Sequence, residues 1–149
     1  MSEIQLQSKI AQTISVRFPK LKGQFFHVSN ERNNKIQAFQ ARSIGIVPGV
    51  SDFLLIEREN IWDDEGFISE TYTKITGIEV KEPGSYHEVA HVRQQVKWAK
   101  VLEYCGGIWF LVTSVDEATK AVTKDYEGLK RIADIEKMLD ECKNKTIRF

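Results

Sequence analysis

The apolar residues near the N-terminus recur at the spacing of an α-helix. Four of them would share one face of a helix over residues 3–18: Ile4, Ile10, Ile14 and Phe18. Ser2 followed by Gln5 forms a capping box that favours a helix start, and Pro19 favours its end. A second helix is predicted over residues 34–44, ended by Gly45. Its inward residues would be Ile36, Phe39 and Ile44.

Short apolar runs predict four strands, at residues 24–28, 52–57, 75–82 and 108–113. The polar stretch 58–73, with its Asp-Asp-Glu-Gly turn, fits a hairpin. The runs at 52–57 and 108–113 are apolar along most of their length, which is typical of buried strands.

Two further helical patterns complete the chain. Residues 88–104 form an amphipathic helix stopped by Gly106 and Gly107. Its apolar positions are Val89, Val92, Val96, Ala99 and Leu102. Ser114 and Glu117 cap another helix, and residues 126–143 continue as a charged helix with an apolar stripe. The stripe consists of Leu129, Ile132, Ile135 and Leu139. The order of elements predicts an α/β fold, with a central mixed sheet of about four strands flanked by helices.

Composition places the chain among globular proteins of one domain. It has 149 residues, of which 42% are hydrophobic. It has no run of eighteen apolar residues and no basic-then-apolar N-terminal segment, so we expect neither a membrane span nor a secretory signal. Cys105 and Cys142 match no zinc spacing and no disulfide framework, which favours a location in a reducing cytoplasm.

Charge is unevenly distributed although the net charge is zero. Residues 1–50 carry seven basic and two acidic residues, whereas residues 51–82 carry three basic and nine acidic ones. A basic segment beside an acidic one suits a protein that binds phosphates and also holds a cation, but it equally fits a solvated surface. The basic residues of a phosphate-binding surface would be Lys9, Arg17, Lys20, Lys22, Arg32, Lys35 and Arg42.

Asp52, Glu79 and Lys81 are the residues best placed for catalysis. Asp52 begins a strand after a turn, and Glu79 and Lys81 share one face of the next strong strand because side chains alternate. Carboxylates at the ends of neighbouring strands can bind a hard cation such as Mg²⁺, and the backbone carbonyl of Val80 could be a further ligand. Lys81 could orient a water or stabilise negative charge. Taken alone, a Glu-x-Lys motif also fits a structural ion pair.

A wider pattern supports the catalytic interpretation. It runs in chain order over residues 3–113: EIQLQ at 3–7, RFP at 17–19, HVSNERN at 27–33, GIVPGVSD at 45–52, GIEVK at 77–81, and Gln95 with Trp98 in a helix. This pattern resembles the VRR-NUC (virus-type replication-repair nuclease) branch of the PD-(D/E)xK nuclease superfamily. Ser51 departs from the commoner proline before the acid, and Glu31 stands where small residues are more typical.

The resemblance implies an Mg²⁺- or Mn²⁺-dependent endodeoxyribonuclease. Asp52 and Glu79 would ligate the metal, with Glu3 as an outer or second-metal acid. Lys81 would be the catalytic lysine, and Gln95 would position water or substrate. Asn30 and Arg32 would lie near the DNA backbone, where Lys35, Arg42 and the loop residue Tyr86 are further candidates for DNA binding.

The resemblance further implies branched DNA, such as a Holliday junction, as substrate. It also implies a homodimer that acts in replication, recombination or repair in the cytoplasm of a bacterial or phage-infected cell. A DNA-binding module that is catalytically silent or depends on a partner is the alternative, and sequence-specific cutting of duplex DNA ranks below both. The tail 114–149 carries no family motif. It could serve as a dimer helix, as a partner-binding element or as a cap on the sheet.

Overall fold

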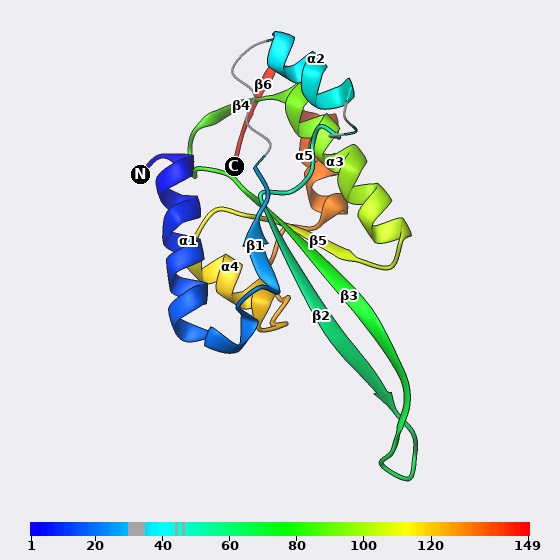
Figure 1. Cartoon of the computed structure of the whole chain (residues 1–149). Helices are drawn as coiled ribbons and strands as arrows, with labels where there is room; N and C mark the ends of the chain where they lie inside the picture. Colours follow the sequence, from blue (N-terminus) through cyan, green and yellow to red (C-terminus); the bar gives the residue numbers. More distant parts are fainter. Residues whose placement is uncertain (30–34, 44, 46) are drawn as a thin grey trace.

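The computed structural model describes residues 1–29, 35–43, 45 and 47–149. Its elements form an α/β domain with a central mixed sheet and helices around it (Figure 1). In chain order the elements are α1 (Glu3–Arg17), η1 (Pro19–Leu21), β1 (Phe25–His27), α2 (Lys35–Ser43), β2 (Phe53–Trp62), β3 (Ile68–Val80), β4 (Tyr86–Glu88), α3 (Val89–Tyr104), β5 (Ile108–Val112), α4 (Val115–Val122), α5 (Ile132–Glu141) and β6 (Thr146–Arg148).

The four-stranded sheet has the order β1-β2-β3-β5. Strands β1, β2 and β3 pair antiparallel, whereas β3 and β5 are parallel and are connected through α3. Phe53 pairs with Ile78 at the start of β2, and Val80 pairs with Val112 at the end of the parallel ladder. The prediction of a mixed central sheet flanked by helices is confirmed.

Helices cover both faces of the sheet at its β3–β5 side. One face packs against α1 and α4 through a cluster that includes Ile10, Ile14, Ile78, Phe110 and Val112. The other face packs against α3 and α5 through a cluster that includes Val92, Ala99, Trp109, Leu111 and Ile135. The apolar runs of β3 and β5 follow from this arrangement, because both of their faces are buried.

The C-terminal tail caps the sheet. Helix α4 joins the first cluster and α5 the second, and β6 pairs with β4 just before α3 begins. Both chain termini lie near the same end of the molecule (Figure 1). The amide of Gly84 donates to the carbonyl of Phe149 at 2.9 Å, which holds the C-terminus beside the loop that follows β3. None of the described helices is long and apolar enough to cross a membrane.

The predicted helix over residues 126–143 is wrong at its start. Helix α5 begins at Ile132, and the preceding residues form a turn in which Gly128 has a φ of 76°. The amide of Leu111 donates to the carbonyl of Lys130, so this segment bonds to strand β5 instead of continuing a helix. Leu129 is buried, but it is inserted into the core from this turn.

Two predicted inward faces are also wrong in part. Ile4 is exposed on α1, where Leu6 is buried instead, because the sheet lies against the face of Leu6, Ile10 and Ile14. On α2, Ile36 and Phe39 are 70% and 68% exposed. Among the described residues, neither apolar cluster includes a side chain of α2. Ile44 lies outside the described residues.

Strands β2 and β3 continue far beyond the sheet as a two-stranded arm (Figure 1). The hairpin expected within residues 58–73 is therefore confirmed. Its turn is closed by Asp63, whose Oδ1 accepts hydrogen bonds from the amides of Glu65 and Phe67.

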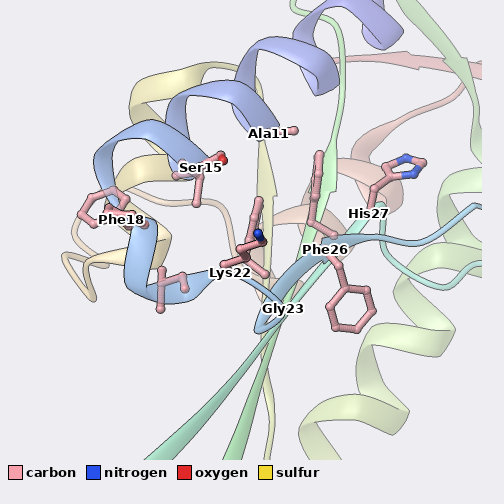
Figure 2. Close-up of a pocket in the computed structure, with 12 residues that line it drawn as sticks. Ala11, Ser15, Phe18, Lys22, Gly23, Phe26 and His27 are labelled. Atoms are coloured by element: carbon pink, nitrogen blue, oxygen red, sulfur yellow. The ribbon is translucent and has the colours of Figure 1, made fainter.

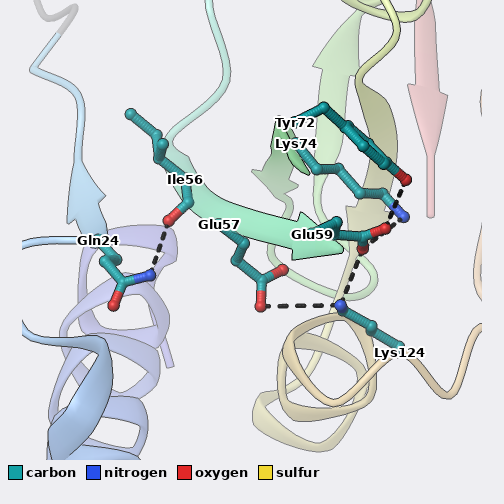
Figure 3. Close-up of polar contacts among 7 residues, drawn as sticks. All are labelled: Gln24, Ile56, Glu57, Glu59, Tyr72, Lys74 and Lys124. Carbon is teal, nitrogen blue, oxygen red and sulfur yellow. Dashed lines mark hydrogen bonds and ion pairs between the residues drawn. The ribbon is translucent and has the colours of Figure 1, made fainter. Parts of the chain in front are cut away.

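Polar contacts brace the base of this arm (Figure 3). The Tyr72 hydroxyl donates to Glu59 Oε2 at 2.6 Å, and Lys124 Nζ lies 2.9 Å from Glu59 Oε1. Gln24 Nε2 donates to the carbonyl of Ile56 at 3.0 Å on the neighbouring edge. The arm is thus tied to the body on both sides of strand β2.

Candidate active site

A turn places Asp52 at the open end of the sheet. The carbonyl of Asp52 accepts from the amide of Val28, and its Oδ2 accepts from the amide of Val80 at 2.7 Å. The turn itself lies against α3, because Gly49, with a φ of 84°, has its Cα beside the carbonyl of Gln94. A Cβ at Gly49 would lie 2.7 Å from that oxygen. Only glycine fits this close approach and this backbone conformation together.

Glu79 and Lys81 lie on the face of the sheet that α3 covers. Glu79 Oε1 is 3.2 Å from Lys81 Nζ, and the two side chains are only 2% and 3% exposed. Gln95 of α3 donates from Nε2 to the same Glu79 oxygen at 2.5 Å. His91, one helical turn earlier, has its Nε2 3.2 Å from Gln95 Nε2. A buried acid is thus held between a cation and an amide.

The backbone of Val80 connects Asp52 to Glu79. The N–H and C=O of one strand residue point to the same side, so the Val80 carbonyl faces the side on which its amide meets Asp52. The backbone amide of Lys81 points to the other edge of β3 and donates a hydrogen bond to the carbonyl of Val112 in β5. Two carboxylates and one backbone carbonyl therefore gather where β2 begins and β3 ends.

Two buried oxygens at this place lack hydrogen-bond partners among the described residues. They are Glu79 Oε2 and Gln95 Oε1. Buried polar atoms are nearly always paired, so unpaired oxygens indicate a position for a cation or a water. Both atoms are acceptors, which favours a cation or a donor over an anion.

Electrostatics in this site disfavour two charged acids. Burial raises the pKa of Glu79 well above 4.5, the negative charge of Asp52 raises it further, and Lys81 opposes the shift. Burial also raises the pKa of Asp52, against the lowering effects of the Val80 amide and Lys81. A bound cation would compensate both carboxylates.

Glu3 and three histidines, His27, His87 and His91, lie around the site of Asp52 and Glu79. The negative charge of Glu3 at the start of α1 contributes to raising the pKa of both Asp52 and Glu79, so Glu3 acts electrostatically on both acids. Gln7 Oε1 accepts a hydrogen bond from His27 Nε2 at 3.1 Å. Burial and the charge of Lys81 lower the pKa of His87 and His91.

No group of three or more His, Cys, Asp and Glu side chains that could hold a metal ion occurs among the described residues. The donors at the end of β3 are of another kind, with two carboxylates and a backbone carbonyl. Hard cations such as Mg²⁺ bind to one or two carboxylates and complete their coordination with water and substrate. The donor set therefore fits Mg²⁺ or Mn²⁺ and does not fit a structural zinc site.

The predicted DNA-binding residues are only partly placed. Asn30 and Arg32 lie outside the described residues. Lys35 begins α2, and Arg42 is exposed on the same helix. Tyr86 is exposed on β4, with the Arg148 guanidinium 5.5 Å from its ring centroid. Tyr86 thus lies beside His87, at the same end of the sheet as Glu3.

A pocket of about 370 Å³ adjoins the site between α1, η1 and β1 (Figure 2). It shares His27 and Phe53 with the surroundings of Asp52 but does not include the carboxylates. Apart from His27, Lys22 is the one titratable residue in its lining. Its walls are mostly apolar, so the pocket offers packing surface beside the site.

Sequence reasoning did not foresee the contact between His91 and Gln95. The two residues are four apart on α3, so they share a helix face, and this spacing was the available signal. Comparisons of the chain with models of protein families, with curated proteins and with solved structures found no match.

Proposed function

We propose that this chain is a metal-dependent endodeoxyribonuclease with a PD-(D/E)xK core formed by β2, β3 and α3. The observation that carries the proposal is the position of Asp52 beside the strand of Glu79 and Lys81. Asp52 accepts a 2.7 Å hydrogen bond from the amide of Val80, and the residues on either side of Val80, Glu79 and Lys81, form a 3.2 Å ion pair. A buried cation–carboxylate pair is costly to keep, so its position beside a second acid favours a functional role.

Asp52, Glu79 and the Val80 carbonyl would hold Mg²⁺ or Mn²⁺, with Glu3 as an outer acid. The unpaired Glu79 Oε2 and the raised pKa values of both carboxyl groups support this assignment. When bound, the ion would neutralise phosphate charge and lower the pKa of a water.

The remaining roles belong to residues already in place. Lys81 holds a fixed ammonium group beside Glu79, where it would stabilise negative charge that develops on the phosphate. Gln95 orients Glu79 through Nε2, and its free Oε1 can accept a hydrogen bond from a water. Burial under α3 keeps bulk solvent away and strengthens these interactions.

The substrate we propose is branched DNA, bound by a homodimer during replication, recombination or repair. Tyr86, Lys35 and Arg42 are the described residues proposed to contact it. Tyr86 is the best supported of the three, since it is exposed and lies at the end of the sheet where the acids gather.

Cleavage of labelled four-way junction, flap, single-stranded and linear duplex DNA tests the proposal. We expect wild type to cut with Mg²⁺ or Mn²⁺ and to stop cutting with EDTA. Asp52→Asn and Lys81→Met should each lower the rate by at least about a hundredfold, because each removes a group that acts at the phosphate. Glu70→Gln is the matched control, since it removes an exposed acid elsewhere on β3 and should leave the rate unchanged.

Binding without cutting under every metal would contradict the nuclease proposal. It would favour the alternative, a DNA-binding module that is silent or depends on a partner. The complete burial of Glu79 in a pair with Lys81 is the observation that favours this alternative, because such a pair can also be structural. A folded variant is required in each case, and circular dichroism supplies that check.

A further inference from the structure

The end of the β2–β3 arm exposes a group of large apolar side chains. Trp62 and Phe67 are 61% and 66% exposed, and Ile61 and Ile68 beside them are also exposed. An isolated two-stranded ribbon is marginally stable in water, and contiguous exposed apolar surface usually marks a contact with another molecule. We refer to these four residues as the arm tip.

The charge around the arm tip narrows the choice of partner. Residues 60–73 contain four acidic residues and no basic ones: Asp63, Asp64, Glu65 and Glu70. Such a ribbon repels the phosphates of nucleic acid. It also repels a second arm, because two tips placed face to face would bring like charges together. The partner surface must therefore combine apolar side chains with positive charge.

Helix α2 presents such a surface. Ile36 and Phe39 are exposed and belong to neither apolar cluster of the described chain, and Arg42 is exposed one turn further on. The sequence of α2, residues 35–43, contains two basic residues and no acidic ones. The apolar and charged features of α2 thus complement those of the arm tip.

The two surfaces cannot meet within one copy. Helix α2 and the arm tip lie at opposite ends of the molecule (Figure 1). In a two-fold pair of antiparallel copies, each arm tip would meet α2 of the other copy, and the same contact would be made twice. We propose that the chain forms a two-fold dimer in which the arm tip of each copy packs against α2 of the other. This proposal is independent of whether the chain cuts DNA.

Sedimentation velocity of complementary variants tests the dimer. An arm variant, Trp62→Ser with Phe67→Ser, and an α2 variant, Ile36→Ser with Phe39→Ser, each damage both contacts of their own homodimer. Both variants should be monomeric at concentrations at which wild type is dimeric. An equimolar mixture should form dimers again, because a mixed pair keeps one intact contact, between the α2 of the arm variant and the arm of the α2 variant.

The control is Val16→Ser, which removes an exposed apolar side chain from α1 and should leave the dimer unchanged. Arg42→Glu should weaken association, and salt raised from about 0.05 M to about 0.5 M should weaken the wild-type dimer, because screening reduces the attraction between opposite charges. Circular dichroism verifies that each variant folds.

Five outcomes would overturn the proposal. Wild type that stays monomeric up to millimolar concentration would exclude the dimer. A dimer unchanged by the arm variant would place the interface elsewhere. An α2 variant that remains dimeric while the arm variant is monomeric would indicate arm-to-arm pairing, and variants that fail to associate when mixed would exclude the reciprocal contact. Growth of wild type into larger species with concentration would indicate an open head-to-tail contact instead of a closed pair.

Discussion

At the scale of single residues, the position of Asp52 depends on Gly49. Its positive φ and its contact with the carbonyl of Gln94 leave no room for a side chain. We expect Gly49→Ala to lower the free energy of unfolding by about 2 kcal/mol, from left-handed backbone strain together with the clash. Urea unfolding measures this. The rate of DNA cleavage should decrease as well, because this turn positions Asp52 and packs against α3, the helix that contains Gln95.

Gly66→Ala is the matched control for Gly49→Ala. Gly66 has nearly the same φ, 86°, but nothing lies within 4 Å of an added Cβ. Only the backbone strain should appear there, about 1 kcal/mol. If the two variants lost the same free energy of unfolding, the packing of the Gly49 turn on α3 would contribute nothing to stability.

The Glu79–Lys81 pair should lower the free energy of unfolding, although the proposed activity requires it. Replacing both residues by apolar ones of similar size, Glu79→Leu with Lys81→Met, should leave stability unchanged or raise it, because two buried charges no longer need to be desolvated. Glu79→Ala alone should cost about 3 kcal/mol, since it leaves Lys81 buried without its partner. Urea unfolding compares the three proteins, and none of the variants should cut DNA. A double variant much less stable than wild type would indicate a purely structural pair.

Strand alternation was sufficient to predict that Glu79 and Lys81 share a face, and the turn before Asp52 predicted its place at a strand start. The contacts that join them are long-range, however. Val80 bonds to Asp52 across 28 residues and Gln95 bonds to Glu79 from another element. Periodicity carries no information on such pairs, which depend on how β2, β3 and α3 pack.

At the scale of elements, the base of the arm should respond to acid. The hydrogen bond from Tyr72 and the contacts with Lys124 lower the pKa of Glu59 from 4.5 to about 2. In the unfolded chain this carboxyl protonates near 4.5. The stability that its charged form provides is therefore present above pH 4.5 and is lost as the pH falls towards 2.

Glu59→Gln tests this dependence. Because Glu59 lies at the surface, the variant should be less stable than wild type by under about 1 kcal/mol at pH 7. The difference should close between pH 4.5 and 2, as measured by urea unfolding at each pH. In a Tyr72→Phe background the same difference should depend less on pH, because the main cause of the low pKa is gone. A constant difference from pH 7 to 2 would exclude the role of Glu59.

Elements with a strong apolar pattern were predicted well, whereas the polar halves of β2 and β3 were expected only as part of a hairpin. The amphipathic pattern was sufficient to predict α3, and the apolar run was sufficient to predict β5, because the burial of apolar side chains determines both elements. Strands β4 and β6, three residues each, were not predicted because their pairing joins segments about sixty residues apart. The start of α5 was missed because the bond between Leu111 and Lys130 overrides helical spacing.

At the scale of the whole molecule, metal binding should raise thermal stability. An ion that binds the folded state alone stabilises it, by about 2.7 kcal/mol at a concentration one hundred times its Kd. We expect Mg²⁺ or Mn²⁺ to raise the Tm of wild type and EDTA to reverse the rise. Asp52→Asn should lose the effect, whereas Glu70→Gln should keep it. Differential scanning calorimetry without DNA gives this result independently of cleavage, and an unchanged wild-type Tm would count against the metal site.

The closeness of the two chain termini has a practical consequence. Glu3 lies beside the acids of the site, and Phe149 is held against the loop after β3. An affinity tag fused to either end would thus start next to the place where DNA must approach. Basic or histidine-rich tags could bring their own ligands to a metal ion there, and bulky ones could block the substrate. Assays of this chain therefore require tag-free protein.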